Sequence, residues 1–268
     1  MRVFLFLCFL LSDYHAIAQY LDTLVTVDNH QLHFSLIPGQ GVPILFESGN
    51  GDDSSVWEPL LAQIHTETGA TLLTYDRAGL GKSGIDPRKI SFKREAKNLK
   101  KALKKLGYKN DFFLVAHSFG SFYAAEFSQR HKGKIRGAVL IDVSTPCSLT
   151  VEYATRVKNS ISEEIWALIK THKLGLYHVL RNFPELAAYI SNRFLSDSIP
   201  LTILAAEIRE ANPEIGETEQ DLTRVDECLK ALGSLPNNKY VLAKSTGHKV
   251  WKDDPQIVID NIVEWYKK

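Results

Sequence analysis

One serine in the sequence stands where a sharp turn could hold a nucleophile. Ser118 lies in the segment Ala116-His117-Ser118-Phe119-Gly120, after an apolar run at Phe112–Ala116 and before a helical pattern over about 119–131. Small neighbours let a strand turn directly into a helix, and such a turn lifts the serine hydroxyl clear of the backbone. A serine that only caps the helix would fit the residue type, but the strand before it and the helix after it favour a nucleophile. Attack on a carbonyl also needs a base within hydrogen-bond reach of the hydroxyl.

The elements that would position Ser118 alternate between strands and helices. Strands are expected at Leu24–Val27, Leu32–Leu36, Pro43–Glu47, Thr71–Tyr75, Phe112–Ala116, Gly137–Ile141, Leu201–Ala205 and Tyr240–Ala243. Helical patterns are expected at about 55–67, 91–106, 119–131, 218–233 and 256–267. The first two runs flank a turn-forming segment and predict an antiparallel pair, and the apolar runs that follow are typical of buried parallel strands. The sequence therefore predicts an α/β fold with a mostly parallel, eight-stranded sheet flanked by helices.

One long stretch interrupts the alternation. From about 149 to 196 apolar residues recur at helical spacing and no good strand is present, so several short helices are expected between two strands. Such an insertion could cover the active edge of the sheet as a lid, or it could be ordinary helical packing with no gating role. No repeat or linker divides the chain, so residues 19–268 are expected to form one domain that carries a helical cap at about 149–196.

Three motifs, in this order and at this spacing, resemble those of the α/β-hydrolase superfamily. Ser48-Gly49-Asn50-Gly51 follows the third expected strand, Asp76-Arg77-Ala78-Gly79-Leu80-Gly81-Lys82-Ser83 follows the fourth, and the Ser118 turn follows the fifth. The chain is similar to the single-domain members with a helical cap, from about Leu24 to Trp265. Two departures are present: Ala116 replaces the usual first glycine of the turn, and Ser48-Gly49 stands where relatives often carry His-Gly.

The resemblance implies that a histidine and an acid complete a triad with Ser118. His248 lies in the loop after the last expected strand, where the family places its base. Most relatives place the acid after the strand that corresponds to Leu201–Ala205, where Glu207 and Glu210 are the candidates. Other relatives place it after the preceding strand, where Asp142 stands. Asp142 is preferred here, Glu207 and Glu210 remain alternatives, and Asp142 could also simply cap the next turn.

The resemblance also implies an oxyanion hole made of two backbone N–H groups. One would come from Phe119, directly after the nucleophile, and the other from Asn50 or, as an alternative, Gly51. Only backbone donors are required, so the departure at Ser48-Gly49 need not abolish activity. Asp76-Arg77 and the glycines behind them are interpreted as structural, and His117 is expected to point away from Ser118.

These features predict an enzyme that transfers an acyl group to water through Ser118. A small-molecule ester or amide is the expected substrate, and no cofactor or metal is expected because no metal-binding pattern is present. Fold and triad alone do not choose among reactions, so an aminopeptidase, a carbon–carbon hydrolase and a cofactor-free oxidase or peroxidase stay open. A catalytically inactive, hydrolase-like binding protein is the alternative from another class. Haloalkane or epoxide hydrolysis is disfavoured, because relatives with those activities use an aspartate where this chain has Ser118.

The N-terminus has the pattern of a secretory signal. Arg2 precedes an apolar run at Val3–Leu11, and Ala16-Ile17-Ala18 provides a small-residue cleavage site. We expect cleavage after Ala18, removal of residues 1–18, and a mature chain that is periplasmic or secreted. The run is too short for a permanent membrane span, which needs about 20 residues. The alternative is a buried first strand or an uncleaved anchor.

The cysteines and the charged residues bear on two further questions, whether a disulfide forms and whether the protein binds nucleic acid. After cleavage only Cys147 and Cys228 remain, and two buried free thiols are preferred slightly over a disulfide between them. The formal net charge is +1, which gives no indication of nucleic-acid binding. One stretch is rich in lysine and is interpreted as the solvated face of a helix; its lysines are Lys97, Lys100, Lys101, Lys104 and Lys105.

Overall fold

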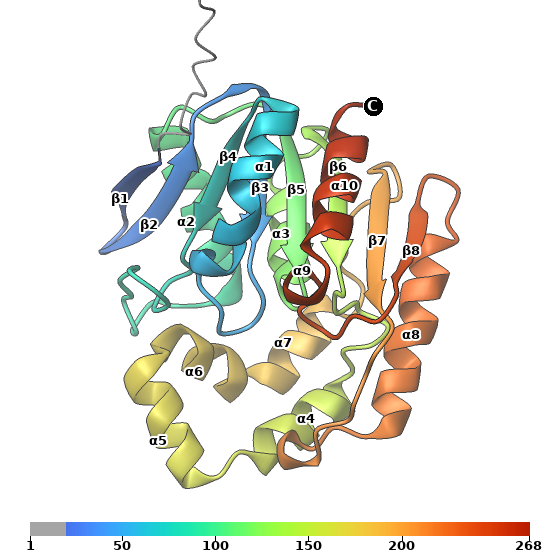
Figure 1. Ribbon diagram of the computed structural model, residues 1–268. Helices are drawn as coiled ribbons and strands as arrows, with labels where there is room; N and C mark the ends of the chain where they lie inside the picture. The colour runs from blue at the N-terminus through green and yellow to red at the C-terminus, as the bar shows by residue number, and fades with distance from the viewer. Residues whose placement is uncertain (1–19) are drawn as a thin grey trace, which may run out of the picture.

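The computed structural model describes residues 20–268, and its centre is one eight-stranded sheet (Figure 1). The strands lie in the order β1-β2-β4-β3-β5-β6-β7-β8. Their bounds are β1 Leu21–Val27, β2 His30–Ile37, β3 Gln40–Glu47, β4 Ala70–Tyr75, β5 Phe112–His117, β6 Ile135–Ile141, β7 Leu201–Ala206 and β8 Lys239–Ala243. The pairs β1–β2 and β2–β4 are antiparallel and all other pairs are parallel. The predicted α/β fold with a mostly parallel, eight-stranded sheet is confirmed.

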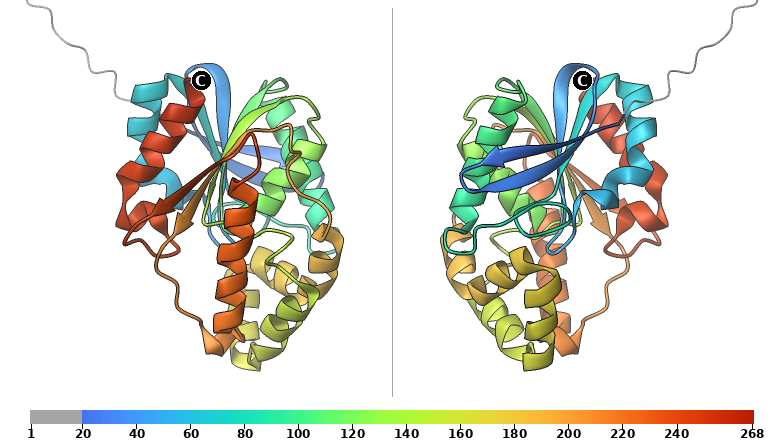
Figure 2. Two further views of the ribbon diagram at one scale, coloured as in Figure 1. Left: turned by 90° about the vertical axis from the view of Figure 1, so that its right-hand side faces the viewer. Right: turned by 90° about the vertical axis from the view of Figure 1, so that its left-hand side faces the viewer.

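Helices cover both faces of this sheet (Figure 2). One face carries α1 (Glu58–Thr68), α9 (Val250–Asp253) and α10 (Pro255–Tyr266), and the other carries α2 (Phe92–Lys105), α3 (Gly120–Gln129) and α8 (Glu219–Gly233). The helix expected over about 55–67 begins instead as a 3-10 turn at Ser54–Trp57 and becomes α-helical at Glu58. Pro59 explains the position of this boundary, because proline fits the first turn of an α-helix, where its missing N–H is not needed.

The side chains of the central strands alternate between two buried cores. In β5, Phe112 and Leu114 pack in the core beneath α2, α3 and α8, whereas Phe113 and Val115 pack in the core beneath α1 and α10. This period of two is the geometry of a strand whose faces are both covered. The end of β5, where Ser118 follows, is therefore held from both sides.

A third layer of helices lies over the carboxyl ends of the parallel strands (Figure 1). Between β6 and β7 the chain forms α4 (Val151–Ser160), α5 (Glu163–His172), α6 (Leu174–Arg181) and α7 (Phe183–Ile190). A separate apolar cluster joins α7 to the helix after Ser118, with Phe119 and Phe122 on one side and Phe183 and Leu186 on the other. We call α4–α7 the cap.

The cap is also joined covalently to the rest of the fold. Cys147, which precedes α4, forms a disulfide with Cys228 on α8, and their Cα atoms are 5.8 Å apart. The preference for two free thiols is therefore wrong. The residues are separated by 81 positions, and only the folded arrangement brings them within bridging distance.

Removal of this disulfide is expected to destabilise the protein. For the double variant Cys147→Ser/Cys228→Ser, we expect the free energy of unfolding to fall by about 2–4 kcal/mol, because an open loop of this length gains entropy in the unfolded chain. Denaturant unfolding with and without a thiol reductant measures the effect, and the reductant should leave the double variant unchanged. Identical wild-type curves in both conditions would argue against a stabilising bridge.

Within residues 20–268, no helix combines the length and the apolar character that crossing a bilayer requires. The predicted signal at residues 1–18 lies outside the residues that the structure describes.

Candidate active site

Ser118 occupies a strained turn between β5 and α3. Its φ is +51°, in the left-handed region that most side chains avoid, at a cost of about 1–3 kcal/mol. Gly120 makes the turn possible: a Cβ at this position would lie 2.5 Å from the backbone oxygen of Ser48 and 2.6 Å from that of Glu47. The turn therefore packs directly against the end of β3, with the Ser118 hydroxyl directed away from the sheet.

His248 bridges Ser118 and Asp142. It lies in the loop between β8 and α9, where its Nε2 is 3.0 Å from Ser118 Oγ and its Nδ1 is 2.6 Å from Asp142 Oδ2. Its side chain is 53% exposed, so solvent reaches the imidazole. Three side chains that are 24 to 130 positions apart in the sequence are thus joined by two hydrogen bonds in series.

Asp142 is the buried end of this series. It follows β6 with a φ of +43°, and its side chain is only 1% exposed. Its Oδ1 accepts a hydrogen bond from Ala206 N at 3.0 Å, and Arg209 donates to both of its carboxylate oxygens. Burial alone would raise the pKa of Asp142, but the hydrogen bonds from His248 and Arg209 outweigh it and hold the pKa at about 2. The carboxylate therefore stays charged at neutral pH.

The other two candidate acids lie elsewhere. Glu207 accepts a hydrogen bond from Ser245 N at 2.7 Å, in the loop that leads to His248. Glu210 is exposed and makes no hydrogen bond to another described residue. The structure thus brings Asp142 to His248, and it brings neither glutamate there.

Arg209 is a residue of this site that the sequence analysis missed. It follows β7 and lies between Asp142 and Asp226 of α8, whose Oδ1 accepts a hydrogen bond from Arg209 Nε at 2.7 Å. This fork of donors fixes the plane of the Asp142 carboxylate. Local sequence gives no sign of it, because the pairing depends on β6 and β7 being neighbours in the sheet.

His117 makes no hydrogen bond to Ser118 and instead supports the loop that carries His248. It is buried, and its Nε2 lies 3.0 Å from the backbone oxygen of His248, to which the ring N–H donates. Burial holds the pKa of His117 well below its usual range, so the ring is neutral. The carbonyl next to the exposed imidazole of His248 is thereby tied to the end of β5.

The two expected oxyanion donors flank the turn. Within residues 20–268, neither the N–H of Phe119 nor that of Asn50 donates to a protein acceptor, and both belong to segments beside Ser118. Free N–H groups in such a place can donate hydrogen bonds to a carbonyl oxygen and stabilise the negative charge that develops on it. The cap touches the same loop, because Lys173 Nζ donates to the backbone oxygen of Gly51 at 2.7 Å.

Arg77 holds the loop that carries Asn50. Its Nη1 donates to the backbone oxygen of Ser48 at 2.6 Å, and its Nη2 donates to that of Gly49. The guanidinium is buried, with its Cζ 4.7 Å from the centre of the Tyr123 ring. Arg77 therefore has a structural role, as expected from the sequence. It orients the two peptide groups that precede the N–H of Asn50.

Two carboxyl groups, the buried Glu47 and the half-buried Glu95, lie near Arg77. Burial raises the pKa of Glu47 to about 8 and that of Glu95 to about 7, even though Arg77 lowers both. The hydroxyl of Tyr75 donates to Glu47, and that of Tyr123 donates to Glu95 at 3.1 Å. Arg77 is therefore fixed by a network in which Glu47 is buried and Glu95 is half-buried.

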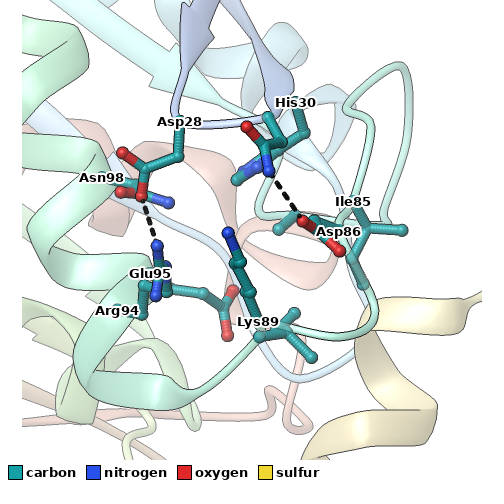
Figure 3. A pocket seen from close by; sticks show the side chains of 11 residues that line it. Asp28, His30, Ile85, Asp86, Lys89, Arg94, Glu95 and Asn98 are labelled. Atoms are coloured by element: carbon teal, nitrogen blue, oxygen red, sulfur yellow. Dashed lines mark hydrogen bonds and ion pairs between the residues drawn. The ribbon is translucent and has the colours of Figure 1, made fainter.

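Figure 3 shows a small polar pocket beyond this network, between the β1–β2 turn, the loop before α2 and α2 itself. His30, Glu95 and Asn98 line it, and at its rim Arg94 Nη2 is 3.0 Å from Asp28 Oδ2. The cavity has about 10 Å³, which is room for about one water molecule. It is too small for an organic substrate.

Comparisons with known proteins agree on the fold. The family described as alpha/beta hydrolase fold matches residues 42–161. The uncharacterized protein YqjL of Bacillus subtilis (strain 168) is 28% identical over 89% of this chain and 89% of its own length. A thermophilic esterase from Thermogutta terrifontis is 20% identical with a TM-score of 0.60, over 93% of this chain and 98% of that one. The haloalkane dehalogenase DatA from Agrobacterium tumefaciens C58 is 16% identical with a TM-score of 0.67, over 92% and 96%.

Proposed function

The chain belongs to the α/β-hydrolase superfamily, and from that premise we propose that it is a serine hydrolase that cleaves an ester or an amide. The observation that carries the proposal is the series of hydrogen bonds from Ser118 Oγ through His248 to Asp142, at 3.0 Å and 2.6 Å. Proton transfer from a serine hydroxyl requires a base within hydrogen-bond reach and a third group that orients this base. The imidazole of His248 and the buried carboxylate of Asp142 stand in these two positions.

The reaction runs through an acyl-enzyme. Ser118 Oγ attacks the substrate carbonyl while His248 Nε2 takes its proton, and the N–H groups of Phe119 and Asn50 hold the oxyanion. The C–O or C–N bond to the leaving group then breaks as His248 returns the proton to that group. A water molecule, deprotonated by His248, attacks the acyl carbon and releases the acid and the free serine. Asp142 keeps the proton on Nδ1 and stabilises the imidazolium at each step.

The proposal includes export of the protein after removal of residues 1–18. The charged and apolar N-terminal pattern supports it, as does the Cys147–Cys228 disulfide, because disulfides persist in oxidising compartments. The intact mass of the protein recovered outside the cytoplasm should correspond to a chain that begins at Gln19. A mass that includes residues 1–18 would contradict export by cleavage.

Labelling with a fluorophosphonate tests the serine hydrolase proposal directly. The reagent reacts with an activated serine, so it should label the wild type, fail on Ser118→Ala and label His248→Ala only slowly. Circular dichroism confirms that each variant is folded. A folded wild type that does not react would overturn the proposal in favour of a hydrolase-like binding protein.

Replacement of Arg77 is expected to lower the turnover number kcat. The variant Arg77→Met loses both hydrogen bonds to the backbone oxygens of Ser48 and Gly49, so the donor at Asn50 is no longer held in place. We expect kcat to fall about 10- to 100-fold, with KM changed less than about threefold, because the oxyanion forms only in the transition state. Steady-state hydrolysis of a chromogenic ester measures both constants.

The conservative variant Arg77→Lys is the control. A lysine keeps the charge near Glu47 and can reach one of the two carbonyl groups, but it lacks the planar fork. It should recover part of kcat. If Arg77→Met keeps the wild-type kcat, or if KM alone changes, Arg77 does not position the oxyanion loop.

A further inference from the structure

An apolar groove separates the start of α2 from the cap. It has a volume of about 350 Å³ and lies between the segment that leads into α2 and the helices α6 and α7. Ile90 and Phe92 line one wall, and Val179, Leu186 and Tyr189 line the other. A groove of this size and lining can take a hydrocarbon chain.

One end of the groove opens onto a basic depression. Ile90, Ser91 and Lys93 line both the groove and this depression, so the two are continuous. Lys89, Lys93 and Lys97 face it without a carboxylate partner among the described residues. Lys93 Nζ lies 4.1 Å from the centre of the Tyr189 ring, so this ammonium group stands directly at the mouth of the groove.

The charge of this region is unusual for the chain. Helix α2 contains seven basic residues and one acidic residue, the half-buried Glu95, while the whole protein has a net charge of only +1. Asp28 pairs with Arg94 and Lys101, but the cations next to the groove stay uncompensated. Lys100, Lys104 and Lys105 also lack a carboxylate partner among the described residues, so unpaired lysines run along the solvated face of α2. Lys93 and Lys97 differ from them because they face a depression that is continuous with an apolar groove.

The groove is separate from the site around Ser118. No residue of the Ser118–His248–Asp142 series lines it. The wall residue Phe92 contacts Tyr123 in a tilted arrangement with 4.7 Å between ring centres, and the Tyr123 ring centre in turn lies 6.0 Å from that of Phe119. A layer of aromatic rings thus lies between the groove and the turn that carries the nucleophile.

Two acidic residues also line the groove. Glu95 lies at its buried side, where its carboxyl group accepts a hydrogen bond from the Tyr123 hydroxyl. Glu185 is exposed on α7, where water screens its charge. Neither forms an ion pair with Lys93 or Lys97, so the mouth of the groove keeps its positive character.

We propose that this groove binds a single-chain anionic amphiphile, with the hydrocarbon chain between Phe92 and α7 and the carboxylate or phosphate head at Lys93 and Lys97. Apolar burial supplies most of the affinity, and the unpaired ammonium groups select the sign of the head. The groove uses none of the side chains of the Ser118–His248–Asp142 series, so its occupancy can be tested separately from the proposed hydrolysis.

Calorimetric titration of the purified protein tests the chemistry of the ligand. Dodecanoate and dodecyl phosphate are expected to bind saturably, whereas dodecanol and dodecyltrimethylammonium should bind at least about tenfold more weakly. The ratio of the first two affinities distinguishes a free fatty acid from a phosphate-bearing lipid as the source of the head. Equal affinity for anionic, neutral and cationic amphiphiles would overturn the proposal, as would the absence of saturable binding.

Matched charge reversals test the position of the head. The double variant Lys93→Glu/Lys97→Glu should bind dodecanoate about tenfold more weakly. Lys104→Glu/Lys109→Glu changes the net charge equally at the far end of α2, where both side chains are exposed, and should bind as the wild type does. Glu185→Lys should strengthen binding. Equal losses in the two double variants would show a general charge effect and contradict the proposed site.

A photoreactive fatty acid locates the chain. With a diazirine near the end of dodecanoate, we expect crosslinks on the peptide that contains Val179, Leu186 and Tyr189. The variant Ser118→Ala should give the same crosslinks, so the result does not depend on whether the protein is a hydrolase. Crosslinks confined to the segments around Ser118 and His248 would instead show that the amphiphile occupies the proposed active site, and they would overturn a separate groove.

Discussion

Alanine at position 118 is expected to lower kcat for ester hydrolysis by about 10⁵-fold or more, and alanine at position 248 by a similar factor. In the proposed mechanism the hydroxyl of Ser118 provides the attacking oxygen, and the His248 imidazole, 3.0 Å away, takes its proton. The fold should survive both changes, since the side chain of His248 is 53% exposed and Ser118 is only half-buried. Steady-state assays with a short-chain p-nitrophenyl ester measure the loss.

The double variant separates a catalytic unit from two independent contributions. Residues that act as a unit are strongly non-additive, so Ser118→Ala/His248→Ala should be no slower than the worse single variant. A product of the two single effects would show that they act separately. Retention of a tenth of the wild-type rate in Ser118→Ala would remove this serine as the nucleophile.

The second large effect concerns Asp142. We expect Asp142→Asn to lower kcat by about 10³- to 10⁴-fold, because a neutral amide neither holds the proton on His248 Nδ1 nor stabilises the imidazolium. Asparagine tolerates the left-handed backbone that Asp142 adopts at φ +43°, so the turn should keep its shape. In this variant Arg209 faces an uncharged amide in place of the Asp142 carboxylate. The same ester assay measures the loss of kcat.

Glu207→Gln and Glu210→Gln are the controls for the identity of the acid. Neither carboxylate reaches His248, and Glu207 supports the loop only through Ser245 N, so each variant should change kcat less than about fivefold. If one of the glutamine variants falls as far as Asp142→Asn, the acid is misassigned.

Acid unfolding gives a second readout for Asp142. Its pKa of about 2 in the folded protein is lower than the ordinary aspartate value of about 3.9. The ionised carboxylate therefore stabilises the fold above about pH 4, and this contribution is lost as the pH falls towards 2. Asp142→Asn lacks the contribution at every pH, so its unfolding free energy should depend less on pH between about 4 and 2 than that of the wild type.

The sequence supports some residues of the site much better than others. Ser118 and His248 can be chosen because each has a local pattern, a strand that turns into a helix for one and a glycine-histidine loop after the last strand for the other. For the acid the sequence favours Asp142 but leaves Glu207 and Glu210 as alternatives, because carboxylates that follow adjacent strands have no strong local feature to separate them. Only the observed backbone and side-chain positions bring one of them to His248 Nδ1.

The fold was predictable because its signals are local and repeated. Buried strands give continuous apolar runs, and the cap gives apolar residues at helical spacing. Contacts between distant segments have no such signal. Arg209 reaches Asp142 across 67 positions and Arg77 reaches Ser48 across 29, and both depend on the order of strands in the sheet. For the same reason the sequence could not decide between a disulfide and free thiols.

The Cys147–Cys228 bridge closes residues 147–228 into a covalent ring that contains the whole cap and β7. A protease that cuts once inside this ring opens a peptide bond but does not release a fragment, since the two pieces stay joined through sulfur. A nicked molecule would keep the mass of the intact chain plus one water, and it would separate into two polypeptides only after reduction. A single cleavage in the segment that covers the strand ends therefore leaves the cap covalently attached to the rest of the chain.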